Sequence, residues 1–98
     1  MNASQILDEA KVTLSSRAVE YDQPQGERSM AHCVEIFTAI SGIKLSESEG
    51  WLFMLALKLA GAQKGEPKAD TYLEGAAYFA LYGESKLAQQ EQIPLLPT

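Results

Sequence analysis

The chain has little of what most secreted, membrane and metal-binding proteins depend on. It holds one cysteine, Cys33, and one histidine, His32, among 98 residues. A single cysteine cannot close a disulfide within the chain, which predicts a reducing compartment. The longest apolar run, residues 51–57, is far shorter than the roughly 20 residues that a membrane-spanning helix needs. Residues 1–4 show neither the basic nor the apolar region of a secretory signal, so we expect a cytoplasmic protein.

Positive charge is also scarce. Eight Lys and Arg residues stand against thirteen Asp and Glu residues, which gives a formal net charge of −5 and a pI near 4.7. No two basic residues are adjacent, whereas affinity for a phosphate backbone or an anionic membrane comes from clustered Lys and Arg. We therefore expect neither nucleic acid nor a membrane as a partner. The acidic balance instead favours a protein partner with a basic surface.

Recognisable catalytic motifs are absent as well. The sequence contains no G-x-S-x-G element, no phosphate-binding P-loop and no zinc-ligand spacing. His32 and Cys33 are neighbours, so on a helix their side chains would point about 100° apart and could not act as a nucleophile–base pair. Cys33 falls on an apolar stripe and is predicted to lie in the core, and His32 is predicted at the surface. We expect no catalytic residue, no metal site and no cofactor.

What the sequence does have is helical periodicity. Apolar residues recur at helical spacing in four segments, which are residues 4–15, 29–41, 47–60 and 70–90. Asn2 or Ser4 can cap the first segment. Gly42 suits the left-handed position that ends a helix, and Asp70 suits the N-cap of the last segment. These signals predict an all-α fold, a compact bundle of about four helices in a single domain over residues 1–92.

Residues 47–60 form the clearest of these segments. Ser46 and Glu49 have the spacing of a capping box, in which each side chain accepts a hydrogen bond from the backbone N–H of the other. Beyond this cap the segment is apolar apart from Lys58, and Gly61 is expected to end it. A helix without a polar face must be enclosed on most sides, and a chain this short can hardly enclose it alone. We expect a homodimer or higher oligomer that assembles through residues 47–60.

Two stretches lack helical periodicity. Residues 16–28 carry Asp, Pro and Gly in turn-favouring order and predict an ordered loop, and residues 93–98 are bracketed by prolines and predict an extended tail. Ordered loops often carry recognition, and Arg and Tyr are favoured interface anchors, although these side chains could also be ordinary loop residues. The candidate binding residues of this loop are Arg17, Tyr21, Glu27 and Arg28. Trp51 is a further candidate anchor, with burial in the core as the alternative.

Lys58 interrupts the apolar helix, and a buried ammonium is costly unless it is paired. Asp70 and Glu74 lie one turn apart on the next helix and could meet it, which predicts a structural ion pair between antiparallel helices. The alternative is a phosphate or carboxylate ligand bound by Lys58. Together with Glu47 or Glu49, the same two acids would suit a divalent cation, although roles at the starts of helices explain these acids equally well.

Several blocks of the sequence form a recognisable pattern. The first is Arg17-x-x-x-Tyr21-Asp22-x-Pro24-x-Gly26, followed by Glu-Arg-Ser-Met at residues 27–30. The others are Gly-Trp-Leu-Phe-Met at residues 50–54, Leu-Lys-Leu at residues 57–59, and residues 70–78. The pattern resembles a family of small phage and prophage proteins of unassigned function, from which it departs at Gly61 (usually Arg) and Glu74 (usually Asp). The resemblance implies a phage accessory protein and carries no activity with it.

The function expected from these features is that of a small acidic phage protein that binds a host protein and inhibits a defence or regulatory factor. One alternative is a nucleotide-binding or nucleotide pyrophosphohydrolase domain similar to MazG, with Mg²⁺ and with Lys58, Asp70 and Glu74 in the site. Such hydrolases carry paired E-x-x-E and E-x-x-D ligands, and neither pattern occurs in this chain, which favours a protein that is not an enzyme. A second alternative is a structural oligomer without a ligand.

Overall fold

The computed structural model describes the backbone of residues 1–21 and 29–92 and the side chains of residues 1–17 and 29–90. This part of the chain folds into α1 (Ala3–Tyr21), α2 (Ser29–Ser41), α3 (Glu47–Ala62) and α4 (Ala69–Gln92). The predicted all-α bundle of about four helices is therefore confirmed. The loop prediction is wrong for residues 16–21, which extend α1, because no Gly or Pro interrupts the helix there. Residues 22–28 and the predicted tail, 93–98, lie outside the described residues.

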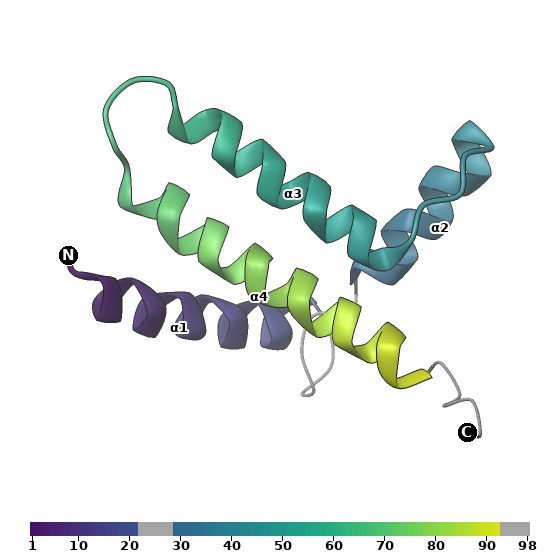
Figure 1. The fold of residues 1–98 in the computed structure, drawn as a ribbon, viewed down its shortest axis with the longest axis horizontal. Helices are drawn as coiled ribbons and strands as arrows, with labels where there is room; N and C mark the ends of the chain where they lie inside the picture. Colours follow the sequence, from purple (N-terminus) through teal and green to yellow (C-terminus); the bar gives the residue numbers. More distant parts are fainter. Residues whose placement is uncertain (22–28, 93–98) are drawn as a thin grey trace, which may run out of the picture.

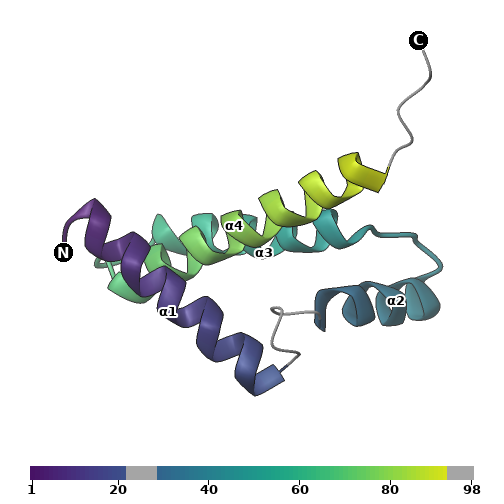
Figure 2. The ribbon, with the colours of Figure 1, turned by 90° about the horizontal axis from the view of Figure 1, so that it is seen from below.

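The helices form two layers. Figure 1 shows α3 and α4 side by side as an antiparallel hairpin with an arched connection, and Figure 2 shows α1 and α2 on one side of that hairpin. α1 packs against α4, and α2 packs against the first part of α3. The hairpin therefore organises the bundle, since each of the other two helices covers one of its members.

Local signals set most of the helix ends. Asn2 and Gln5 cap α1 reciprocally: the Gln5 N–H donates to Asn2 Oδ1 at 2.9 Å, and the Asn2 N–H donates to Gln5 Oε1 at 2.8 Å. Ser46 and Glu49 form the predicted capping box of α3. Gly42 follows α2 with a φ of +75°, the left-handed conformation predicted for it.

Two predicted helix ends are wrong. Gly61 lies inside α3, which continues to Ala62, and Gly65, with a φ of +71°, takes the left-handed position in the loop beyond. A glycine costs a helix only about 1 kcal/mol, which the packing of α3 on α4 can offset. α4 begins at Ala69, so Asp70 lies in its first turn instead of at the N-cap, where its charge still suits the helix dipole.

The core lies where the hairpin meets the other helices. Its buried cluster comprises Met30, Val34, Trp51, Tyr78 and Leu81. Trp51 is only 3% exposed and stacks on Tyr78 with the ring centroids 5.9 Å apart. Of the two predictions for Trp51, an exposed anchor or a core residue, the structure therefore supports the core residue. Gly50 allows α2 to come close, because a Cβ built there would lie 3.1 Å from Val34 Cγ1, well inside the optimal carbon–carbon separation of about 3.5–4.0 Å.

Cys33 is exposed, and the prediction that it lies in the core is wrong. Its spacing groups it with Met30 and Val34, which do reach α3 at Gly50. However, α2 leaves α3 at a wide angle (Figure 1), so its remaining apolar positions find no neighbouring helix. His32 is exposed, as predicted.

The side of α3 that points away from α4 is apolar, and none of the described helices covers it. We name it the outer face; its residues, all exposed, are Leu52, Phe53, Ala56, Leu59 and Ala60. Phe53 is 67% exposed, Leu59 58% and Leu52 45%. The described part of the chain therefore encloses one side of α3 and leaves the other side exposed.

Candidate functional site

Lys58 and Glu74 form an ion pair that joins α3 to α4. Lys58 Nζ lies 2.5 Å from Glu74 Oε2, and the side chains are 31% and 38% exposed. The hydrogen bond to Glu74 raises the pKa of Lys58, and nearby negative charge, including that of Asp70, raises it further. Partial burial acts in the opposite direction and lowers this pKa, but its effect is smaller than that of the hydrogen bond. Lys58 is therefore a protonated cation, and Glu74 is the acid that balances its charge.

Asp70 is exposed, one turn before Glu74 on α4. Glu49 is engaged in the α3 cap, where it accepts the Ser46 N–H at 2.9 Å. Within residues 1–17 and 29–90, no group of three or more His, Cys, Asp and Glu side chains could hold a metal ion. The fold therefore does not bring these acids together as a divalent-cation site would require.

Arg17 lies against the core instead of in a loop. Its guanidinium carbon is 6.0 Å from the centroid of the Tyr78 ring, which is a cation–π distance. Arg17 and Glu74 also line a small cavity of about 30 Å³ between α1 and α4. Arg17 thus ties α1 to the same part of the hairpin that carries the Lys58–Glu74 pair.

The other candidate binding residues are not gathered on one described surface. The side chain of Tyr21 and all of Glu27 and Arg28 lie outside the described residues. Trp51 lies in the core and offers no exposed anchor. The exposed aromatic side chain of this helix is Phe53, two residues further on.

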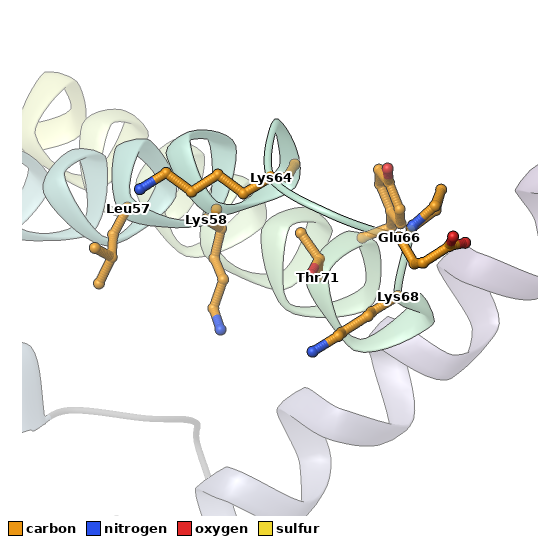
Figure 3. A pocket seen from close by; sticks show the side chains of 10 residues that line it. Leu57, Lys58, Lys64, Glu66, Lys68 and Thr71 are labelled. Carbon is orange, nitrogen blue, oxygen red and sulfur yellow. The ribbon is translucent and has the colours of Figure 1, made fainter.

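A cleft of about 210 Å³ lies under the loop that joins α3 to α4. The charged and hydroxyl side chains that line it are Lys58, Lys64, Glu66, Lys68, Thr71 and Tyr72. Figure 3 shows the side chains of Lys58 and Lys68 ending on the same side of the cleft, with Thr71 next to the end of Lys68, whereas the Glu66 carboxylate points away. The sequence pattern predicts a role for Lys58 alone. The signal that would have found the others is the occurrence of three of the chain's eight basic residues within residues 58–68.

A second hollow, apolar and also of about 210 Å³, runs between α3 and α4. Leu55 and Leu59 of α3 and Gly75 and Ala76 of α4 line it. Gly75 leaves space here, since a Cβ built on it would meet no atom within 4 Å. Because Leu59 also belongs to the outer face, this groove adjoins the exposed apolar surface.

The chain was also compared with known proteins. The model of one family, described as a domain of unknown function (DUF6378), matches residues 5–86, from the first turn of α1 to the last part of α4. Neither a curated protein nor a solved structure matches the chain. Among the described residues, no helix has both the length and the apolar character needed to cross a membrane.

Proposed function

The chain belongs to the DUF6378 family, a domain of unknown function, and we propose that it acts by binding another protein through the outer face of α3. The observation that carries the proposal is an entirely apolar helix face that the described part of the chain leaves exposed. The partner we propose is a host-cell protein in the cytoplasm, a defence or regulatory factor that is inhibited on binding. The resemblance to small phage and prophage proteins supports this choice.

The outer face has the properties of a docking surface. Contiguous exposed apolar patches with a polar rim mark interaction sites, and helical spacing places the exposed polar residues Glu49 and Gln63 at the two ends of this face. Burial of Phe53 and Leu59 against a partner would contribute roughly 25 cal/mol per Å² of apolar surface. The adjoining groove beside Leu59 offers a pocket for an anchoring side chain of the partner.

The charge of the chain supports a partner with a basic surface. A net charge of −5 increases the rate of encounter with a positive surface, and complementary charge at the rim of an interface orients the partner. An acidic protein that docks next to a nucleic-acid-binding surface would compete with the nucleic acid. Inhibition by occlusion follows from such a geometry without a catalytic residue.

Capture from host lysate tests the proposal, with the purified chain immobilised and the salt concentration increased stepwise. Phe53→Asp places a charge on the outer face, and we expect it to abolish retention of the partner. Leu7→Asp is the matched control, because Leu7 is equally exposed, at 64%, but lies on α1. The captured protein is then purified and its binding to both variants measured. Loss of binding by both variants alike, or no retained protein even at low ionic strength, would contradict the proposal.

A second copy of the chain is the second candidate for the outer face. The specific observation in its favour is that none of the five outer-face residues carries a charge, so two chains of net charge −5 could pack there without contact between like charges. Light scattering over a range of concentrations tests this. A structural oligomer predicts a multiple of the chain mass that Phe53→Asp reduces to the monomer, whereas a wild-type monomer at every concentration would exclude it.

A further inference from the structure

The cleft under the α3–α4 loop concentrates positive charge in an acidic protein. We propose that this cleft binds a small oxyanion of the phosphate class between Lys58 and Lys68, with Thr71 completing the site. Three lysines line the cleft against one glutamate, Glu66, in a chain of net charge −5. Like-signed groups in one hollow focus the local field, and Glu74 and Asp70 offset part of the charge of one of the three, Lys58.

The loop places its lysines by backbone contacts of its own. The Lys64 N–H donates to the Gly61 carbonyl at 3.1 Å, and the Thr71 N–H donates to the Lys68 carbonyl at 3.1 Å. Between them Gly65 takes a φ of +71°, a conformation that only glycine adopts at little cost. These constraints hold both ends of the loop, so the backbone positions of Lys64 and Lys68 are defined.

The cleft offers hydrogen-bond donors as well as charge. An ammonium group carries several N–H donors, and one donor of Lys58 is used by Glu74, which leaves others for a ligand. Figure 3 shows the Lys68 ammonium on the same side as that of Lys58, with Thr71 next to the end of Lys68. Bonds from ammonium groups to an oxyanion are roughly twice as strong as neutral hydrogen bonds. Lysine binds phosphate oxygens as a point charge, without the planar fork of arginine.

The volume of the cleft limits the ligand. About 210 Å³ is less than the roughly 300–1,000 Å³ of pockets that enclose drug-sized molecules. The ligand is therefore inorganic phosphate or the terminal phosphate of a small molecule whose remaining part stays outside. Tyr72, which lines the cleft and is 44% exposed, offers an aromatic ring for that outer part.

Titration of the ¹⁵N-labelled full chain with inorganic phosphate tests the site, with the ionic strength held constant by chloride. We expect saturable shifts of backbone amides concentrated in residues 58–72 and no such shifts with chloride alone. Lys68→Gln removes one charge-assisted bond and should weaken phosphate binding about tenfold. Lys64→Gln should weaken it less, because the Lys64 side chain lies along α3 in Figure 3, away from the other two ammonium groups.

Lys86→Gln is the matched control. It removes the same charge from an exposed position near the other end of α4, and circular dichroism checks that each variant is folded. We expect its phosphate affinity to stay within about twofold of wild type, since the screening length of about 10 Å isolates it from the cleft. Equal weakening by Lys86→Gln and Lys68→Gln, or identical shifts with chloride, would overturn the site, as would the absence of any saturable shift.

Parallel titrations with AMP and adenosine identify the source of the oxyanion. Binding of AMP with the same dependence on Lys68 supports a terminal phosphate of a nucleotide-sized ligand, and binding of inorganic phosphate without AMP supports the free ion. Adenosine binding as tightly as AMP would overturn the role of the oxyanion. Phe53→Asp should leave the phosphate titration unchanged, which separates this site from protein binding at the outer face.

Discussion

The two sides of α3 have the same apolar character and opposite surroundings. Trp51 is 3% exposed, whereas Phe53, two residues later, is 67% exposed. The first side chain stacks on Tyr78 of α4, and the second faces away from every described helix. The chemistry of the side chains does not separate them; their position around the helix does. The apolar content of a helix therefore indicates how much surface favours burial. It does not indicate whether that surface is buried within the chain or against another protein.

The largest expected effect is the difference in stability between two variants of α3, each of which truncates an aromatic side chain on one side of the helix. Trp51→Ala should lower the free energy of unfolding by about 3–5 kcal/mol, because it leaves a cavity in the core. Phe53→Ala should change it by less than about 0.5 kcal/mol, as is usual for exposed positions. Urea denaturation followed by circular dichroism measures both. A comparable loss for Phe53→Ala would show that the outer face is covered in solution, and the midpoint would then depend on protein concentration.

Two glycines offer a second comparison between a crowded and an open position, with Gly50 of α3 crowded by α2 and Gly75 of α4 open. Gly50→Ala should destabilise the fold by about 1–3 kcal/mol, because the added methyl group overpacks the contact between α3 and α2 and lies 3.1 Å from Val34 Cγ1. Gly75→Ala should stabilise it by up to about 1 kcal/mol, since helix propensity improves and no atom lies within 4 Å of the new Cβ. Thermal unfolding distinguishes the two. The same sign for both variants would contradict the packing described for Gly50.

The cap of α3 carries a smaller effect. Ser46→Ala should cost about 1 kcal/mol, because an N–H of the first turn loses its acceptor. The hydrogen bond from the Ser46 N–H lowers the pKa of Glu49 below 4.5, so the stabilisation from Glu49 is present above pH 4.5 and is lost as the pH falls through the lowered pKa. Denaturation midpoints measured from neutral to acidic pH should show this loss in wild type. Glu49→Gln should remove that part of the pH dependence, and an unchanged profile would contradict the assignment.

The smallest effect belongs to the Lys58–Glu74 pair. A double-mutant cycle with Lys58→Met and Glu74→Gln should give a coupling of about 0.2–1 kcal/mol, because water screens a pair this exposed. The pKa of Lys58 is raised above 10.5, so the contribution is complete below pH 10.5 and is lost as the pH rises through the raised pKa. Denaturation at neutral and alkaline pH checks both statements. A coupling of zero at neutral pH would assign the ion pair no role in joining the helices.

Signals that act between near neighbours could be read from the sequence. The capping box of α3 and the left-handed Gly42 appear where the sequence predicts them, since both depend on residues within one helical turn. Gly61 and Cys33 are different. Whether a helix continues through a glycine, and whether an apolar stripe finds a neighbour, depends on the packing of other helices. For the same reason the sequence could suggest Glu74 or Asp70 for Lys58 but could not choose between them.

The sequence by itself determined that the described part of the chain is an all-α bundle, because apolar spacing and capping residues act within each segment. It also determined that α3 carries more apolar surface than the fold buries. Only the tertiary structure decided which side of α3 stays exposed, because an apolar helix has no polar stripe to mark its outside and the contacts of Trp51 with α4 set its rotation. The hairpin likewise decided that the lysines of residues 58–68 line one cleft.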